Sequence, residues 1–259
     1  IFSVTEILKR LKFVHSVYDV LPARAGEIIG GHQAVPHSRP YMAIIERELP
    51  SKKASFCDGF LLNKEFVMTA AHCQARSYKV FLGVHNFHHR NGVQEISSEE
   101  AYIHGNFINT DTVFKNDIML IKLPTKAIFN KGVQPIDLPD PGSLSRPKSC
   151  LVSGWGKTSL TAKHQSGVLM EVNVTVTDRQ CPMEHSYCCD GETRNHCILS
   201  PYLQGDSGGP LVCEDGKAYG VVSAFFTPHS GDPSINIFTK ISDYASWINS
   251  TMKHHGMVN

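Results

Sequence analysis

Short runs rich in β-branched and aromatic residues recur along the chain from residue 41 onward, and turn-forming residues separate them. Runs of this length and composition predict β-strands, and regularly spaced short strands favour a barrel or a sandwich. The first half contains six predicted strands: Tyr41–Glu46, Phe56–Leu62, Phe66–Thr69, Tyr78–Leu82, Val93–Tyr102 and Asp117–Leu123. The hydrophobic pattern therefore predicts an all-β fold.

A second half of the chain begins at Gln134–Leu138 and continues the same pattern. It contains five more predicted strands: Ser149–Ser153, Leu169–Val176, Gly209–Glu214, Ala218–Ala224 and Asn236–Lys240. The pattern changes near the C-terminal end, where Tyr244, Trp247 and Ile248 recur at helical spacing and predict a helix over Ile241–Lys253.

Composition narrows the class of protein. The chain has 259 residues, of which 41% are hydrophobic and 19% are charged, values typical of a globular protein of one or two domains. The formal net charge of +1 provides no bulk attraction to nucleic acid or to a membrane surface, and no apolar run approaches the length of a membrane-spanning helix. Eight cysteines indicate an oxidising compartment, and they lack the paired Cys-x-x-Cys spacing with nearby histidines that a zinc site requires.

The segment Gly205–Pro210, with the sequence GDSGGP, suits a nucleophilic serine. A serine hydroxyl is a poor nucleophile at neutral pH, so acyl transfer requires a neighbouring base and a rigid, exposed position for the serine. The glycines on both sides of Ser207 permit a sharp turn, and the amide hydrogens of Gly205 and Ser207 are placed to form an oxyanion hole. For this segment alone, the alternative interpretation is a glycine-rich turn between two strands.

A base and a carboxylate come from two earlier segments. His72 lies in the sequence TAAHC beside a cysteine, and Asp117 lies in NDIMLI, so the order along the chain is His, Asp, Ser. Together with GDSGGP, these segments resemble the three signatures of chymotrypsin-like serine proteases. The resemblance extends from Ile28 to about the C-terminus, and three matches in order make it specific.

The resemblance implies a fold of two packed six-stranded antiparallel β-barrels with the active site in the cleft between them. It assigns residues 28–133 to the first barrel, and residues 134–259 to the second barrel and a C-terminal helix. It also implies that Ser207 attacks the peptide carbonyl, that His72 takes the serine proton and returns it to the leaving amine, and that Asp117 orients His72. This reaction needs no cofactor and no metal.

Activation is predicted to occur at Ile28, in the sequence EIIGG. In the family a new N-terminal isoleucine amine pairs with the aspartate before the nucleophile, so the resemblance implies an ion pair between Ile28 and Asp206. Trypsin-activated zymogens carry Arg or Lys before the isoleucine, whereas this chain carries Glu27. The dipeptide Gly26-Glu27 resembles the propeptide that a dipeptidyl peptidase removes from granzymes and mast-cell chymases, and residues 32–42 also resemble that subgroup.

The resemblance further implies three disulfides, which are Cys57–Cys73, Cys150–Cys213 and Cys181–Cys197. Cys188 and Cys189 are left over, and adjacent cysteines rarely bridge each other without strain. Three interpretations stay open for these two residues: they are free, they pair with another chain, or they rearrange the local disulfide pattern.

The specificity pocket departs from the family pattern. The resemblance places Pro201 at the pocket base, where trypsin-like enzymes have an aspartate, so a preference for basic substrate residues is not expected. Ser223 matches the family, Ala224 replaces the usual aromatic residue, and Phe225 replaces the usual glycine. The Phe225 ring either narrows the pocket mouth or is moved aside by a loop shift. Asn236 falls on the back wall of the pocket.

The sequence is therefore interpreted as a secreted or granule-stored serine endopeptidase that cleaves proteins or peptides and meets serpin-type inhibitors. Residues 1–27 are interpreted as a signal and propeptide, because Ala23-Arg24-Ala25 fits a signal-peptidase site; an unrelated N-terminal extension is the alternative. Asn173 and Asn249 begin glycosylation sequons. The alternative function is a secreted binding homologue that keeps the triad but has a blocked pocket and little or no activity.

Overall fold

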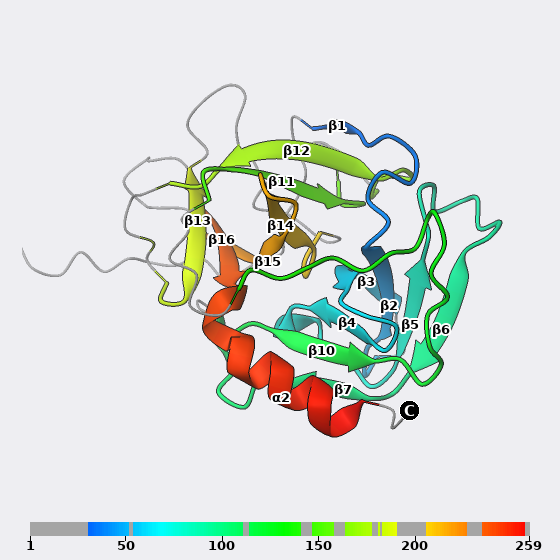
Figure 1. Cartoon of the computed structure of the whole chain (residues 1–259), viewed down its shortest axis with the longest axis horizontal. Coiled ribbons are helices and arrows are strands. Elements are labelled where there is room, and N and C mark those ends of the chain that lie inside the picture. The colour runs from blue at the N-terminus through cyan, green and yellow to red at the C-terminus, as the bar shows by residue number, and fades with distance from the viewer. Residues whose placement is uncertain are drawn as a thin grey trace, which may run out of the picture.

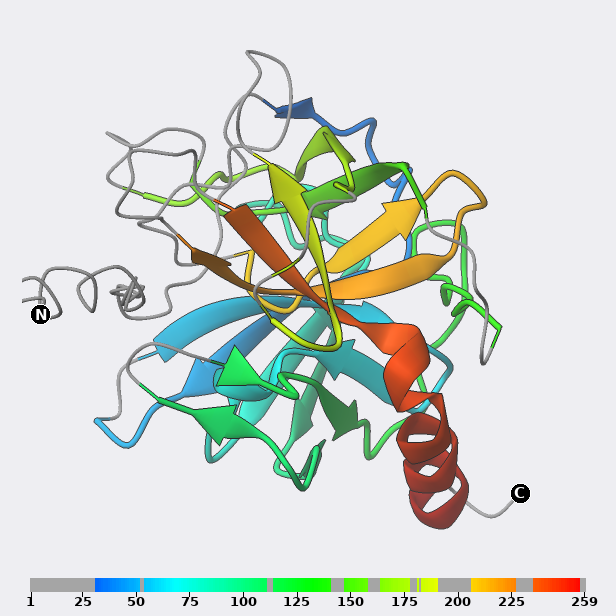
Figure 2. The same cartoon turned by 90° about the vertical axis from the view of Figure 1, so that its left-hand side faces the viewer.

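Two antiparallel β-sheets of seven strands each make up most of the structure, and they lie one above the other in Figure 2. The structure is a computed structural model, and it describes residues 31–51, 54–110, 114–140, 147–157, 164–177, 181, 183–190, 206–226 and 235–256. Within these residues, the helix α2 (Ala245–His255) follows the last strand (Figure 1). The predicted all-β fold class with a C-terminal helix is confirmed.

The first sheet closes into a barrel because the two parts of one predicted strand pair with its opposite edges. Its strands are β2 (Met42–Glu48), β3 (Ala54–Leu61), β4 (Phe66–Thr69), β5 (Tyr78–Leu82), β6 (Gln94–Ser98), β7 (Ala101–Ile103) and β10 (Met119–Lys122). The predicted strand Val93–Tyr102 is interrupted at Glu99 and Glu100, which are exposed, and its two parts are β6 and β7. β6 pairs with β5 at one edge of the sheet and β7 pairs with β10 at the other. Counted as one bent strand, β6 and β7 therefore close a six-stranded barrel.

The second sheet also forms a ring. Its strands are β1 (His32–Gln33), β11 (Ser149–Gly154), β12 (Met170–Thr175), β13 (Ser186–Asp190), β14 (Pro210–Cys213), β15 (Ala218–Phe226) and β16 (Ile235–Lys240). Their order is β1-β12-β11-β14-β15-β16-β13, and Val176, just beyond β12, bridges to Cys189 of β13. This bridge links β13 back to β12, so the six strands β11–β16 form a closed ring. β1 pairs with β12 at the edge of the sheet. β13 was not predicted, because its sequence SYCCD contains no β-branched residue.

Short elements complete the fold. β8 (Ile108–Asn109) and β9 (Phe114–Lys115) pair only with each other, and η2 (Ala71–Cys73) is a single 3-10 turn. The predicted helix Ile241–Lys253 begins with a 3-10 turn, η3 (Ile241–Tyr244), before α2 starts. In the part of the chain that the structure describes, no helix has the length and apolar character needed to cross a bilayer.

The largest hydrophobic cluster joins the two sheets. Phe60 of the first sheet belongs to the same cluster as Val221 of the second, together with Ile241 and Ile248 from the C-terminal helical segment. α2 accordingly lies beside β10 and β7 of the first sheet (Figure 1), although it follows the second sheet in the chain. β1 precedes the first sheet but pairs with the second. Each end of the described chain therefore packs against the sheet that is farther from it in the sequence. The predicted division of the chain between residues 133 and 134 stays a prediction.

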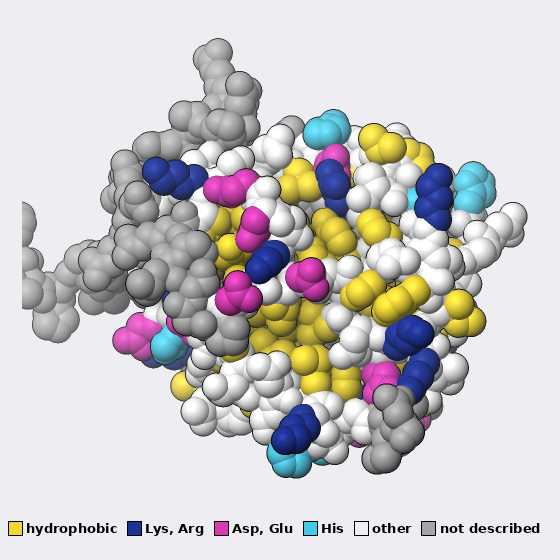
Figure 3. All heavy atoms as spheres, viewed as in Figure 1, with side chains coloured by type: hydrophobic (Ala, Val, Ile, Leu, Met, Phe, Trp, Pro, Cys, Tyr) yellow, Lys and Arg dark blue, Asp and Glu magenta, His cyan; other side chains and the backbone are white. Residues whose placement is uncertain are grey.

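The surface seen in Figure 3 carries charged side chains of both signs. Lys and Arg side chains alternate with Asp and Glu side chains over this face, and neither sign gathers into a broad patch. This distribution fits the formal net charge of +1 for the whole chain.

Candidate active site

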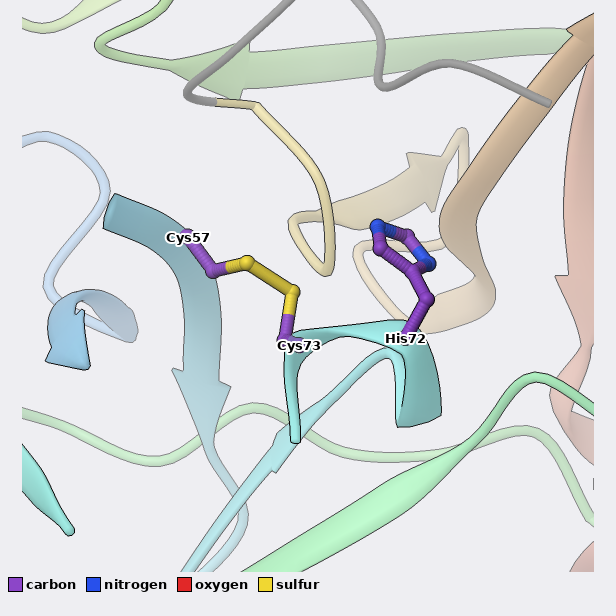
Figure 4. Close-up of side chains that lie close together, drawn as sticks. All are labelled: Cys57, His72 and Cys73. Carbon is purple, nitrogen blue, oxygen red and sulfur yellow. A yellow bond between two sulfur atoms is a disulfide. The ribbon is translucent and has the colours of Figure 1, made fainter. Parts of the chain in front are cut away.

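His72 lies in η2, the turn directly after the buried strand β4. The Cys57–Cys73 disulfide joins this turn to β3, and Figure 4 shows the disulfide and the His72 ring on different sides of the turn. The Arg47 guanidinium donates a hydrogen bond to the His72 carbonyl over 3.0 Å. A covalent cross-link and a charged hydrogen bond therefore hold the backbone that carries the histidine.

Asp117 is only 1% exposed and lies two residues before β10, after Asn116 in a left-handed conformation with φ of 54°. Its Oδ1 accepts a hydrogen bond from His72 N at 2.8 Å, and its Oδ2 lies 2.7 Å from His72 Nδ1. Ser223 Oγ donates to the same Oδ2 at 2.6 Å. Thr239 Oγ1 donates to the Asp117 carbonyl at 3.0 Å, so both the side chain and the backbone of Asp117 are held.

These contacts decide the charge of Asp117. Burial by itself raises the pKa of Asp117, but the charge of His72 and the hydrogen bonds from His72 and Ser223 outweigh burial, and the pKa lies below its ordinary value. A carboxylate cannot donate a hydrogen bond, so the proton between the two side chains belongs to His72 Nδ1. His72 Nε2 is then the nitrogen left to accept a proton, which is the arrangement that a general base requires.

Ser207 is 1% exposed, and its backbone lies beside the turn that carries His72. Asp58 N donates to the Ser207 carbonyl at 2.8 Å, and Cys73 Sγ lies 3.8 Å from the same oxygen. Among the described residues, neither the buried Ser207 Oγ nor the buried His72 Nε2 has a hydrogen-bond partner. The oxygen expected to attack and the nitrogen expected to take its proton are therefore both unengaged, on neighbouring backbone segments.

The packing around Ser207 requires a glycine at position 208. Gly208 has a φ of +86°, and a Cβ there would collide with Thr69 Oγ1 and with the Asp58 carbonyl. Gly208 N also donates to the Val222 carbonyl at 2.9 Å. The segment is thus held between β4 and β15, and this fixes the position of Ser207.

Asp206 is fully buried next to Ser207 in the chain. Its Oδ1 accepts a hydrogen bond from Gly156 N at 2.6 Å, and Gly154 and Gly156 leave the space that its carboxylate occupies. The predicted partner of Asp206, Ile28, lies outside the described residues, and so does Gly205, the predicted second oxyanion donor. Both pairings therefore stay predictions.

The predicted substrate-binding residues lie on β15 and β16, except Pro201, which is outside the described residues. The Ser223 hydroxyl is engaged by Asp117. Phe225 is opposite Asn236 in the pairing of the two strands and is 4% exposed. Ala224 packs in a hydrophobic cluster, and because neighbours along a strand point to opposite faces, Phe225 lies on the other face of β15.

Phe114 lies against His72, although no motif in the sequence pointed to it. Its ring stacks on the His72 ring with centroids 4.8 Å apart and an interplanar angle of 13°. Phe114 also packs against the cluster that contains Ala224. The signal in the sequence is an aromatic residue three positions before Asp117, in a mostly polar loop. One face of the His72 ring is therefore covered by an aromatic ring.

The disulfides match two of the implied pairings and correct the third. Cys57 pairs with Cys73, and Cys150 pairs with Cys213. Cys181 pairs with Cys188, and the implied pairing of Cys181 with Cys197 is therefore wrong. Cys197 itself lies outside the described residues.

The unpredicted strand β13 explains this correction. Because its side chains alternate between two faces, Cys188 and Cys189 point in opposite directions. Cys188 packs in the cluster that Cys181 contacts, whereas Cys189 packs in the cluster of Cys150. The rearranged local pattern is thus the correct one of the three interpretations for Cys188.

Two groups of potential metal ligands occur among the described residues: Cys57 with His72 and Cys73, and Cys150 with Cys213 and Glu214. In each group the two cysteines are joined to each other in a disulfide. A disulfide sulfur is not the thiolate that binds a metal, so neither group forms a metal site.

Known proteins resemble this chain over most of its length. A family model described as Trypsin matches residues 28–248. Granzyme B of Homo sapiens is 41% identical over 240 residues, which cover 90% of this chain and 94% of that protein. Cathepsin G of Homo sapiens is 40% identical over 240 residues, which cover 89% of each. A solved structure described as "Structure of GrC" has a TM-score of 0.75 at 37% identity and covers 88% of this chain and 100% of its own.

Proposed function

Because this chain is a granzyme-like member of the trypsin family of serine proteases, we propose that it cleaves peptide bonds through an acyl-enzyme on Ser207, with His72 and Asp117 as catalytic partners. The observation that carries the proposal is the double contact between Asp117 and His72, through the backbone at 2.8 Å and the ring at 2.7 Å. This contact leaves Nε2 as the only ring nitrogen that can take the serine proton.

The reaction follows from these roles. Ser207 Oγ attacks the substrate carbonyl carbon while its proton moves to His72 Nε2, and the ionised Asp117 stabilises the charged imidazolium. The amides of Gly205 and Ser207 hold the oxyanion of the tetrahedral intermediate. His72 then gives its proton to the leaving amine, the C–N bond breaks, and water releases the acyl group by the same steps.

Covalent labelling tests this assignment. A fluorophosphonate should label the processed protein, and Ser207→Ala should remove the label and nearly all peptidase activity, about a millionfold in turnover. His72→Ala should lose as much, and the two losses should not add, because each residue works only with the other. Retained activity in Ser207→Ala would sink the assignment.

The preferred substrate side chain is proposed to be uncharged. Pro201 brings no charge to the pocket base, and Phe225 is buried on β15 beside the strand that carries Asn236. A peptide library should therefore show poor cleavage after Lys or Arg. Phe225→Gly should widen the range of accepted side chains, and an unchanged library profile in that variant would mean that the ring points away from substrate.

Activation is proposed to follow a cut after Glu27. The buried Asp206 carboxylate accepts a hydrogen bond from Gly156 N, and the new Ile28 ammonium would add a partner of opposite charge. Gly26-Glu27 supports removal by a dipeptidyl peptidase after an earlier cut at Ala25, as the resemblance implies. N-terminal sequencing of the active protein should begin at Ile28.

Storage in a secretory granule, or secretion, fits both the disulfides and the similarity to granzymes and cathepsin G. Asn173 and Asn249 are both exposed, so both sequons are open to glycosylation. Protein or peptide substrates and serpin-type inhibitors are the proposed partners.

A second candidate function rests on the buried Phe225. If its ring fills the pocket, the protein keeps its triad and acts as a secreted binding homologue with little or no activity. Labelling at Ser207 together with peptide turnover supports the enzyme, and labelling without turnover of any library member supports the binding homologue.

A further inference from the structure

Asp58 is a buried acid that the proposed reaction does not use. It follows Cys57 in β3 and is only 2% exposed. Its backbone holds the nucleophile segment, because Asp58 N donates to the Ser207 carbonyl at 2.8 Å and the Asp58 carbonyl accepts a hydrogen bond from Thr69 Oγ1 at 2.7 Å. A charge on the Asp58 side chain therefore belongs to a residue whose backbone is hydrogen-bonded directly to Ser207.

The Asp58 carboxyl faces the carboxyl of Asp206. A Cβ on Gly154 would collide with Oδ2 of Asp58 and with Oδ1 of Asp206, so one oxygen of each acid converges on the same glycine. Consecutive backbone amides supply donors to the two acids: Trp155 N donates to Asp58 Oδ2 at 3.3 Å, and Gly156 N donates to Asp206 Oδ1 at 2.6 Å. The two acids thus share one buried site.

Two adjacent buried carboxyl groups cannot both carry a charge without a cation or a proton between them. Burial and the charge of Asp206 raise the pKa of Asp58 well above its ordinary value. Asp58 also lines a cavity of about 640 Å³ together with His88, Lys157 and His164. Within the described residues, none of these three side chains forms an ion pair with Asp58.

We propose that Asp58 is a positioning residue for the segment that carries Ser207: it forms a proton-sharing pair with Asp206, so that one proton lies between the two buried carboxyl groups. The effect of this pair on activity rests on the proposed function. When the shared proton leaves to solvent as the pH rises, an unbalanced negative charge appears beside Asp206. Repulsion then acts on the segment that carries Ser207, through the 2.8 Å contact with the Asp58 backbone.

The sign of the pH effect follows from the raised pKa of Asp58. The unfolded chain releases this proton near the ordinary Asp pKa of about 4, whereas the folded chain keeps it to higher pH. Stability from the pair is therefore fully present below about pH 4 and is lost as the pH rises through the raised pKa.

Thermal unfolding of the full chain tests the pair. A Ser207→Ala background prevents self-cleavage, and Asp58→Asn keeps the shape of the side chain without a charge. The Tm advantage of Asp58→Asn over its parent should grow with pH, by about 3–5 °C for each pH unit over which folded Asp58 keeps its proton. Asp140→Asn is the matched control, since the Asp140 side chain is 88% exposed, and its Tm difference should stay flat.

The unfolding measurements would overturn the proposal in any of the following cases. The Tm curves of Asp58→Asn and its parent could run parallel across pH. If Asp58→Asn fails to fold, Asp58→Ser replaces it, and Tm curves of Asp58→Ser and the parent that run parallel across pH would overturn the proposal. The pH-dependent effect of Asp58→Asn could also be undiminished in an Asp206→Asn background, whereas the pair predicts a smaller effect there.

Activity adds a readout that a purely structural role would not move. In the processed enzyme that begins at Ile28, Asp58→Asn should keep activity to higher pH than the parent, and a shift to lower pH would contradict the shared proton. The Tm series does not depend on Ile28. Failure of the Ile28–Asp206 pairing would instead appear as full activity in processed Asp206→Asn, so the two failures are distinguishable.

Discussion

Asp117 and Asp58 are two buried acids at different sites, and the sites differ in what surrounds the carboxyl group. Asp117 is 1% exposed, yet the charge of His72 and the donors of His72 and Ser223 overcome burial and lower its pKa. Asp58 is 2% exposed, faces a second acid, and has a raised pKa. Nearly equal burial thus accompanies opposite shifts, because neighbouring cations and donors decide the charge of a buried carboxyl group.

The two sites consequently act on stability with opposite signs. Asp117, with a lowered pKa, contributes stability that is present above the ordinary Asp pKa of about 4 and is lost as the pH falls through the lowered value. Asp58, with a raised pKa, contributes stability in acid that is lost as the pH rises. A rise in pH above the ordinary Asp pKa therefore lowers the contribution of Asp58 to stability and leaves that of Asp117 intact.

Among the buried acids, the largest expected effect on turnover is at Asp117, and it tests whether Asp117 and Asp58 have different roles. Asp117→Asn should lower turnover by about 10⁴-fold, because an amide in place of the carboxylate favours the wrong His72 tautomer. Steady-state kinetics of the processed enzyme on a peptide substrate measures this loss. Asp58→Asn is the matched control, since it makes the same chemical change at the other buried acid and should retain turnover. Similar losses in both variants would remove the distinction between the two sites.

A smaller effect is expected at Asp206. Asp206→Asn in the processed enzyme should lower turnover by roughly 100- to 1000-fold, because Asp206 directly follows Gly205, the proposed oxyanion donor. The variant should still unfold cooperatively, as followed by circular dichroism, since Gly156 N can donate to an amide oxygen as it does to the carboxylate. A loss of turnover that is accompanied by loss of the folded state would argue for a purely structural role.

The smallest expected effect lies outside both acid sites. Replacing Cys181 and Cys188 together by Ser should cost about 2 kcal/mol of stability, because the closed loop is short. The pH dependence of Tm should stay parallel to that of the parent. Mass spectrometry of a non-reduced digest of the parent should show Cys181 linked to Cys188, and a peptide that links Cys181 to Cys197 would contradict the structure.

Local pattern was enough to locate much of the fold. β4 and β5 have the bounds that the hydrophobic runs predict, and the segments around His72, Asp117 and Ser207 are located by their resemblance to the three family signatures. This works because strand periodicity and glycine-rich turns are properties of neighbouring residues. The division of Val93–Tyr102 at two glutamates was not predicted, because the break is needed only when β6 and β7 pair with opposite edges of the sheet to close the barrel.

By itself, the sequence determined the fold class, the order of the three motif residues and the absence of a strong net charge. Only the tertiary structure decided that Phe114 stacks on His72, that Cys181 reaches Cys188, and that Asp58 faces Asp206. The physical reason is that these contacts depend on how separate strands and loops pack in space. A charge or a thiol acquires its chemistry from neighbours that the packing brings close, and Asp58 and Asp206, far apart in the chain, meet only when β3 lies against the segment before β14.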